Sequence, residues 1–326
     1  MRTTVRIVVI LIFAAALLVG GVGFWGVATH RAAGPLNGYA RLVIPRGATL
    51  TEVAAQLRLA GVIRHPTIFI LAARLNGLTI KAGEFEFTNH MTASDVLQWL
   101  DDGKSVVRRV TVPEGISNRD VARLLENATG LEGTLSLQIA EGALLPDTYH
   151  YSYGDSRDEV ARRMTRAMDD ALRELWPRRV SGLPIKTPRE AVILASIVEK
   201  ETAVAAERPR VAAVFLNRLR RNMRLQSDPT VAYALQRGDS ALNAALTRRD
   251  LQLDNPFNTY RYEGLPPGPI SNPGRAAIEA VLRPLETDEL FFVADGSGGH
   301  AFARTLEEHN RNVARWRARQ KRLKVD

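Results

Sequence analysis

The longest apolar stretch of the chain lies near its N-terminus. Residues 7–28 form an uncharged run of 22 positions, and about 20 apolar residues suffice for a helix to cross the hydrocarbon core of a bilayer. The run therefore predicts a transmembrane helix. A cleaved signal peptide is the alternative, but its apolar core is usually only about 7–15 residues long. We expect an uncleaved membrane anchor.

The residues flanking this run predict its orientation. Arg2 and Arg6 precede it, and positively charged flanks favour the cytoplasmic side of a membrane. Residues 1–6 are therefore expected in the cytoplasm, although His30 and Arg31 weaken the asymmetry. Residues 29–39 contain small residues, Gly and Pro, which is typical of a linker. The rest of the chain is expected outside the inner membrane, facing the periplasm.

A weak internal repeat follows the linker. The triplet PRG at 45–47 and the apolar pattern after it recur 68 residues later as PEG at 113–115. In each copy, the Ser, Thr or Asn residues that follow suit the N-cap of a helix. Each copy therefore predicts a strand, a Pro/Gly turn and a helix.

Residues 40–107 form the first predicted domain. Within it, residues 83–87 alternate polar and apolar side chains, as a half-buried strand does. The order of a strand, two helices and a returning strand loosely resembles a LysM-like carbohydrate-binding module. The same unit is equally compatible with a structural spacer that binds no ligand.

The remaining pattern completes an α+β fold class. Residues 108–186 are expected to form a connecting α+β segment. Its residues 156–176 carry Val160, Met164, Met168 and Leu172 at helical spacing on one face. Residues 187–326 are expected to form a larger α+β domain that ends in a helix near Lys324.

The clearest helix start is at residue 187. Thr187 suits an N-cap, Pro188 suits the first helical position, and Glu190 completes a capping box. A helix is expected to begin here and to continue into the most informative part of the sequence.

Further along this helix, one acidic residue continues the apolar face. Leu194, Ile197, Val198 and Glu201 fall at i, i+3, i+4 and i+7, so the pattern directs Glu201 toward the core or a cleft. Glu199 is about 200° away around the helix and is expected to face solvent. Burial and the negative end of the helix dipole would both raise the pKa of Glu201, which suits a general acid. The alternative is a solvated glutamate beyond a frayed helix end.

Several ordered motifs closely resemble the MltG (YceG-like) family of endolytic murein transglycosylases. The motifs are ASIVEKETAV (195–204), VFLNRL (214–219), MRLQSDPTV (223–231), NTY (258–260), GLPPGPI (264–270), NPG (272–274), FFVADG (291–296) and GGH (298–300). The resemblance extends from the anchor to the C-terminus. It implies that the second glutamate of the EKET motif, Glu201, is the catalytic residue.

The resemblance also implies the reaction. The β-1,4 bond between N-acetylmuramic acid and N-acetylglucosamine would be cleaved without water as nucleophile. Glu201 would protonate the glycosidic oxygen and then take the proton of the muramyl C6 hydroxyl, which leaves a 1,6-anhydro end. Such enzymes act near the membrane on newly made strands, close to the synthases that polymerise them, and help to set strand length. No cofactor or metal is expected.

Other polar residues are assigned more loosely. A second carboxylate, if one exists, would be Asp228, Asp254 or Glu263, although each also suits a cap or a turn. The residues expected to contact sugar, because amides, hydroxyls and an aromatic face suit the hydroxyl and acetamido groups of glycans, are Gln226, Asp228, Thr230, Asn258, Tyr260, Asn272 and His300. For most of these residues, cap or turn chemistry is an equally good explanation. The loop at 264–269 is expected beside the cleft, since its Pro and Gly content makes it stiff.

Composition excludes several other functions. The chain has no cysteine, so thiolate and Cys–zinc chemistry are ruled out. The six histidines show no HExxH pattern, and Ser297 lacks the flanks of a nucleophile elbow. The net charge of +9 is compatible with nucleic acid, but the anchor places the chain outside the cytoplasm.

The charge has a simpler interpretation. Two basic segments, Arg218 to Arg224 with its four arginines Arg218, Arg220, Arg221 and Arg224, and the tail from Arg315 to Lys324, are expected to be solvated helix faces, or to contact anionic lipid or the carboxylates of stem peptides. The non-enzymatic alternative is a membrane-anchored scaffold that binds murein without cleaving it.

Overall fold

The structure is a computed structural model that describes residues 2–235 and 246–322. The chain divides into two compact units. The first comprises residues 1–108, 129–132 and 150–155, and the second comprises residues 109–128, 133–149 and 156–326. Both units combine helices with two-stranded sheets, which confirms the predicted α+β class.

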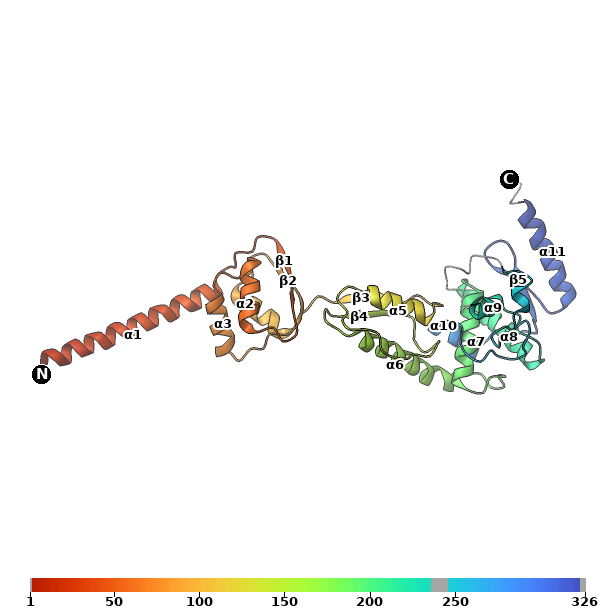
Figure 1. Cartoon of the computed structure of the whole chain (residues 1–326), viewed down its shortest axis with the longest axis horizontal. Coiled ribbons are helices and arrows are strands. Elements are labelled where there is room, and N and C mark those ends of the chain that lie inside the picture. The colour runs from red at the N-terminus through yellow and green to blue at the C-terminus, as the bar shows by residue number, and fades with distance from the viewer. Residues whose placement is uncertain (1, 236–245, 323–326) are drawn as a thin grey trace. The chain divides into compact units, whose positions relative to one another are not determined.

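The N-terminal helix α1 spans Arg2–Arg31. Its segment Arg6–Arg31 lies in the long helix at the N-terminus (Figure 1) and is long and apolar enough to cross a membrane. Its apolar side chains are largely exposed. Because exposed apolar side chains are stable in lipid rather than in water, this helix fits a single-pass membrane anchor. The predicted span at 7–28 falls inside it.

The rest of the first unit is a small α+β module. Its elements are β1 (Tyr39–Ile44), α2 (Leu50–Leu59), α3 (Pro66–Leu75), β2 (Gly83–Thr88) and α4 (Ala93–Asp102). β1 and β2 pair antiparallel, with Tyr39 opposite Thr88 and Ile44 opposite Gly83. Buried residues of the strands and helices, including Phe69, Phe85 and Leu97, form one core. The order of strand, two helices and returning strand agrees with the sequence pattern.

The internal repeat has the predicted local structure. β1 leads through a turn into α2, and β3 (Arg108–Thr111) leads through a turn into α5 (Asn118–Asn127). Gly47 and Gly115 occupy equivalent turn positions with φ of 81° and 79°, which glycine adopts without steric cost. Thr49 and Ser117 then cap their helices. The repeated triplet therefore encodes a repeated turn.

One side chain of the returning strand differs from the alternating pattern. Glu84 is buried, with its side chain 4% exposed, because Arg108 donates to both of its carboxylate oxygens at 2.7 and 3.0 Å. A buried carboxylate requires such a partner. The strand predicted at 83–87 is present, and this ion pair is why Glu84 is buried in it.

The second unit contains most of the helices. Its remaining elements are β4 (Thr148–Tyr151), α6 (Arg157–Leu175), α7 (Pro188–Glu201), α8 (Arg208–Arg220), α9 (Asp228–Ala234), α10 (Arg275–Leu282), β5 (Phe291–Ala294), β6 (His300–Ala303) and α11 (Leu306–Arg322), with short 3-10 turns at Trp176–Arg178, Ala205–Glu207 and Asp250–Gln252. β3 pairs with β4 and β5 pairs with β6. Side chains of α6, α7, α8 and α10 share one core. The predicted end of the last helix near Lys324 lies outside the described residues.

Helix α7 passes through this core. Thr187 caps it by accepting a hydrogen bond from the Glu190 backbone N–H, as predicted. The Glu190 carboxylate accepts from the Lys186 backbone N–H rather than from that of Thr187, so the predicted capping box is only half formed. Every residue of α7 from Ala191 to Val198 is buried. The helix is therefore rigidly held, and it delivers its last residue, Glu201, to a fixed position.

Candidate active site

Glu201 is the last residue of α7 and faces the loop that precedes α9. Ser227, the N-cap residue of α9, donates from Oγ to Glu201 Oε1 at 2.5 Å. Ser227 is itself buried, and its backbone N–H donates to Thr259 Oγ1 at 3.0 Å. The hydroxyl that contacts Glu201 is thus held in place from behind.

The surroundings of Glu201 favour its neutral form. Burial raises the pKa of Glu201 to about 7, because the carboxylate loses its hydration. The Ser227 hydrogen bond opposes this shift, nearby Asp228 adds to it, and His300 and Arg218 oppose it from greater range. A carboxyl group with a pKa near 7 can both donate and accept a proton at neutral pH.

A cavity of about 440 Å³ opens beside Glu201. The residues that line it are Glu201, Arg218, Leu225, Gln226, Asp228, Tyr260, Phe292, Val293, Ala294, His300 and His309. They come from α7, α8, the segment leading into α9, the first residue of α9, the NTY motif, the β5–β6 hairpin and α11. Five of the predicted site residues, which are Glu201, Gln226, Asp228, Tyr260 and His300, therefore meet in one cavity.

The loop that carries Ser227 has an unusual backbone. Gln226 has a φ of 51° although it is not glycine, and its backbone N–H donates to Thr259 O at 3.1 Å. Non-glycine residues adopt this conformation at an energetic cost, so the surrounding hydrogen bonds must hold it. The conformation directs the Gln226 side chain to the cavity and the Ser227 hydroxyl to Glu201.

Asp228 and Tyr260 form a pair on the cavity wall. Tyr260 Oη donates to Asp228 Oδ1 at 2.6 Å. Burial raises the pKa of Tyr260, and its bond to Asp228 raises it further. Asp228 is the first residue of α9 rather than its N-cap, which is Ser227. The predicted cap position was therefore one residue too late.

His300 is oriented by a carboxylate outside the cavity lining. Its Nδ1 lies 2.7 Å from Glu207 Oε2, and its backbone N–H donates to Glu207 Oε1 at 2.9 Å. Thr202, the residue after Glu201, donates from Oγ1 to the same carboxylate at 3.2 Å. Burial raises the pKa of Glu207, but its hydrogen bonds with His300 outweigh this and hold the pKa below its usual value. Glu207 was not among the site residues predicted from the sequence.

Arg218 also lines the cavity. Of the two expectations, a solvated helix face or a contact to lipid or stem-peptide carboxylates, the first is wrong, because Arg218 is only 7% exposed. Its Nε donates to Leu290 O and its Nη1 to Leu225 O, both at 2.7 Å, and its guanidinium lies 5.3 Å from the centre of the Phe291 ring. Carbonyl groups and an aromatic face that hold a buried guanidinium leave no local sequence signature.

Three predicted sugar contacts have other partners. Thr230 donates to Ser227 O at 2.6 Å, Asn258 donates to the carbonyls of Leu251 and Leu253, and Asn272 accepts from the Leu144 backbone N–H at 3.0 Å. All three are buried, and none lines the described cavity. Their side chains stabilise loops around the site.

Two further predictions concerned the cleft. Asp254 and Glu263 are exposed and lie outside the lining residues, and the loop at 264–269 also contributes no residue to the described cavity. This loop instead leads into Ile270, whose backbone N–H donates to Ser196 of α7. Across residues 2–235 and 246–322, no three His, Asp or Glu side chains are grouped to hold a metal ion.

Glu199 does not face solvent as expected. Its side chain is 4% exposed, and its carboxylate accepts from Arg208 Nη2 at 2.9 Å and from the Gly274 backbone N–H at 2.9 Å. Helical periodicity gives the direction of a side chain but not what lies opposite it. Here α8 and the N-terminus of α10 cover that side of α7.

Comparison with known proteins extends over most of the chain. The sequence profile of the YceG-like family matches residues 42–315. The chain is 30% identical over 323 residues to an endolytic murein transglycosylase of Streptococcus pneumoniae (strain ATCC BAA-255 / R6), which covers 85% of this chain and 58% of that protein. It is 29% identical over 305 residues to an endolytic murein transglycosylase of Bacillus subtilis (strain 168), with 82% of each chain covered.

A solved structure gives the same result. A YceG-like protein from Listeria monocytogenes superimposes with a TM-score of 0.51 at 29% identity, covering 84% of this chain and 98% of that one. The chain spans well over half of the length of the streptococcal relatives, but less than two thirds of it. The cavity around Glu201 lies within the matched region. On these grounds the chain belongs to the YceG-like family.

Proposed function

We propose that this chain is a membrane-anchored endolytic murein lytic transglycosylase in which Glu201 is the catalytic acid and base. Membership of the YceG-like family and the similarity to endolytic murein transglycosylases of Streptococcus pneumoniae and Bacillus subtilis support the activity. The observation that carries the assignment of Glu201 is its position at the end of a buried helix, in a cavity, with a pKa of about 7.

The proposed chemistry needs no water. The neutral Glu201 carboxyl donates its proton to the glycosidic oxygen as the bond from that oxygen to the muramyl C1 breaks, and the N-acetylglucosamine hydroxyl leaves. The muramyl C6 oxygen then bonds to C1 while its proton passes to the Glu201 carboxylate. The acid is thereby regenerated, and the product carries a 1,6-anhydro end.

The other polar residues of the cavity are proposed to bind the glycan. Gln226, Tyr260 and His300 offer donors and acceptors that suit hydroxyl and acetamido groups. Asp228, paired with Tyr260, is proposed to bind substrate rather than to activate water. Arg218 adds a positive charge that suits a carbonyl or carboxylate of the substrate.

The anchor suggests where this reaction takes place. We place residues 1–6 in the cytoplasm, α1 in the inner membrane and the catalytic unit in the periplasm, on the basis of the basic residues before the span. Such an enzyme would meet newly made glycan strands near the synthases that polymerise them and would end their elongation. The small module is proposed to assist by holding glycan.

Digestion of polymeric murein by the full chain in detergent tests the proposal. Mass spectrometry of the products is expected to show 1,6-anhydromuramyl ends. Reducing ends instead would indicate a hydrolase that uses water and a second carboxylate. Binding of murein without any cleavage would favour the non-catalytic scaffold.

A further inference from the structure

Positive charge is concentrated in the membrane-proximal part of the chain. The first 83 residues contain nine Arg or Lys and one acidic residue, Glu52, whereas the other 243 residues contain 35 basic and 34 acidic residues. Nearly all of the net charge of +9 therefore belongs to the anchor and to the first part of the module. Murein binding at the cavity of the second unit gives no reason for this distribution.

Several of these cations are exposed and lack an acidic partner. Arg31, Arg58, Arg64 and Arg74 are all exposed, and within the described residues none of them forms an ion pair. Surface cations in a folded domain are commonly balanced by nearby acids, as Arg41 is by Glu86. Exposed cations without an acidic partner are suited to an anionic surface.

Helix α3 combines these charges with exposed apolar residues. Its sequence is apolar over most of its length, and Leu71 and Leu75 are 58% and 78% exposed. The two leucines are one helical turn apart and therefore share a face, with Arg74 beside them. In water this face is unfavourable, but an apolar face flanked by basic residues is stable at a bilayer surface.

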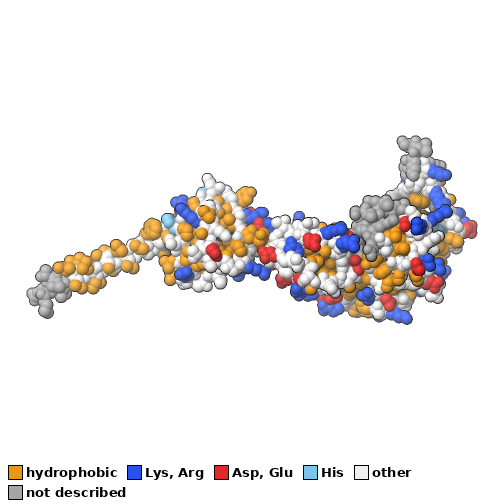
Figure 2. Space-filling model, viewed as in Figure 1, with side chains coloured by type: hydrophobic (Ala, Val, Ile, Leu, Met, Phe, Trp, Pro, Cys, Tyr) orange, Lys and Arg blue, Asp and Glu red, His pale blue; other side chains and the backbone are white. Residues whose placement is uncertain are grey.

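Helix α3 also lies against the anchor. α1 contacts α3 and α4, and Trp25 meets His65, which precedes α3, in an edge-on ring contact with centroids 5.7 Å apart. α3 crosses the end of the module from which α1 departs (Figure 1), and hydrophobic and basic side chains gather there (Figure 2). If α1 spans the bilayer, its last turns and α3 are at the height of the lipid headgroups.

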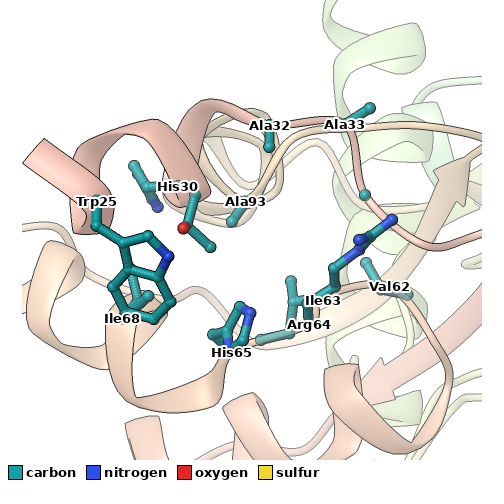
Figure 3. Close-up of a pocket in the computed structure, with 12 residues that line it drawn as sticks. Trp25, His30, Ala32, Ala33, Val62, Ile63, Arg64, His65, Ile68 and Ala93 are labelled. Atoms are coloured by element: carbon teal, nitrogen blue, oxygen red, sulfur yellow. The ribbon is translucent and has the colours of Figure 1, made fainter.

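A small cavity occurs at this junction. It has a volume of about 200 Å³ and opens between the end of α1 and the start of α3. Trp25 and His30 border it from α1, and Arg64, His65 and Ile68 border it from the module (Figure 3). Tryptophan is enriched at membrane interfaces, and guanidinium and imidazole groups bind phosphate.

We infer that this face of the module docks on the surface of the membrane that α1 spans, with anionic phospholipid as its partner. The face is defined as the junction cavity together with Arg64, Leu71, Arg74 and Leu75. The leucines enter the headgroup layer, and the arginines and the junction cavity contact lipid phosphates. The inference depends on the proposed membrane anchor, but not on murein cleavage.

Site-specific labelling of the full chain tests this docking. The chain has no native cysteine, so single cysteines at Leu71 and Leu75 can carry a fluorophore in vesicles that contain nitroxide-labelled lipid. Lys104 is the matched control position. It is exposed and follows the C-terminus of α4, about 15 Å of helix away from Ala93 at the junction cavity. Val19, in the middle of α1, reports insertion of the anchor.

The expected result is lipid quenching at Val19, Leu71 and Leu75 but not at Lys104, in phosphatidylglycerol vesicles. Replacing phosphatidylglycerol by phosphatidylcholine should weaken quenching at Leu71. Arg64→Gln or Arg74→Gln should also weaken it, and each should reduce the docking equilibrium constant about fivefold. Lys104→Gln should leave it unchanged.

Three outcomes would overturn the inference. Quenching at Val19 with none at Leu71 and Leu75 would show an inserted anchor without docking. An absence of quenching at Val19 would show that α1 does not insert into the bilayer, and the inference would then lose its basis. A change in the fluorescence of the label at Leu71 that occurs only when murein is added would assign this face to glycan instead of lipid.

Discussion

Two glutamates of α7, Glu199 and Glu201, lie two residues apart but have different partners. The carboxylate of Glu199 is held by Arg208 and by the Gly274 backbone N–H. Glu201 receives a hydrogen bond from a neutral hydroxyl, that of Ser227, and within the described residues it forms no ion pair. Burial raises the pKa of both groups, and for Glu199 the bonds from Gly274 and Arg208 oppose the shift.

The difference shows what separates a structural carboxylate from a chemical one. Both residues are on the same helix and are largely removed from water. Arg208 holds Glu199 as a hydrogen-bond acceptor and joins α7 to α8. Glu201 instead borders an open cavity and has a pKa of about 7. The elements packed opposite α7, rather than α7 itself, therefore set the two roles.

The largest expected effect comes from removing the acid. Glu201→Gln should lower the rate of murein cleavage by about 10²- to 10⁴-fold, because an amide can neither donate nor accept the proton. Thermal unfolding should change little, since glutamine fills the same volume. Release of anhydromuropeptides per folded molecule measures the loss. Glu199→Gln is the matched control. An equal rate loss in that variant would contradict the different roles assigned to the two glutamates.

The next effect is on stability rather than on chemistry. Glu199→Gln should lower the free energy of unfolding by about 1–3 kcal/mol, because Arg208 loses its buried charged partner and keeps the more exposed Glu114. Urea denaturation of both variants measures this. A Glu201→Gln protein that proved less stable than the Glu199→Gln protein would contradict the assignment of roles.

A smaller effect concerns the pH dependence of the rate. Glu201 must be protonated to act as an acid, so with a pKa of about 7 the rate should fall as the pH rises through 7. Ser227 donates to the carboxylate and lowers this pKa, so Ser227→Ala should move the falling limb to higher pH. The rate at its optimum should drop about tenfold. A limb that stayed in place or moved to lower pH would show that Ser227 does not act on the catalytic group.

Local rules predicted much of the framework. The capping residues at Thr187 and Pro188 fixed the start of α7, and helical spacing placed Glu201 at the end of its apolar face. The repeated Pro-x-Gly triplets predicted two equivalent turns before α2 and α5. In each case the relevant interaction lies within a few residues along the chain.

The rest depended on contacts between distant segments. Nothing near Glu199 in the sequence indicates that Arg208 and Gly274 cover it. Arg218 has the spacing of a surface arginine, and its carbonyl partners come from segments that only the fold brings together. Amide and hydroxyl side chains such as Asn258 and Asn272 can bind backbone or sugar equally well, so sequence alone could not divide cavity residues from loop supports.

The central claim is that one carboxylate performs both proton transfers. Cleavage of murein in ¹⁸O-labelled water, by the wild-type chain and by Asp228→Asn, tests it most directly, because Asp228 is the other carboxylate on the cavity wall. The account predicts unlabelled 1,6-anhydro ends from both proteins, with weaker substrate binding in the variant. Labelled reducing ends from the wild type, lost in Asp228→Asn, would contradict it and identify a hydrolase with two catalytic carboxylates.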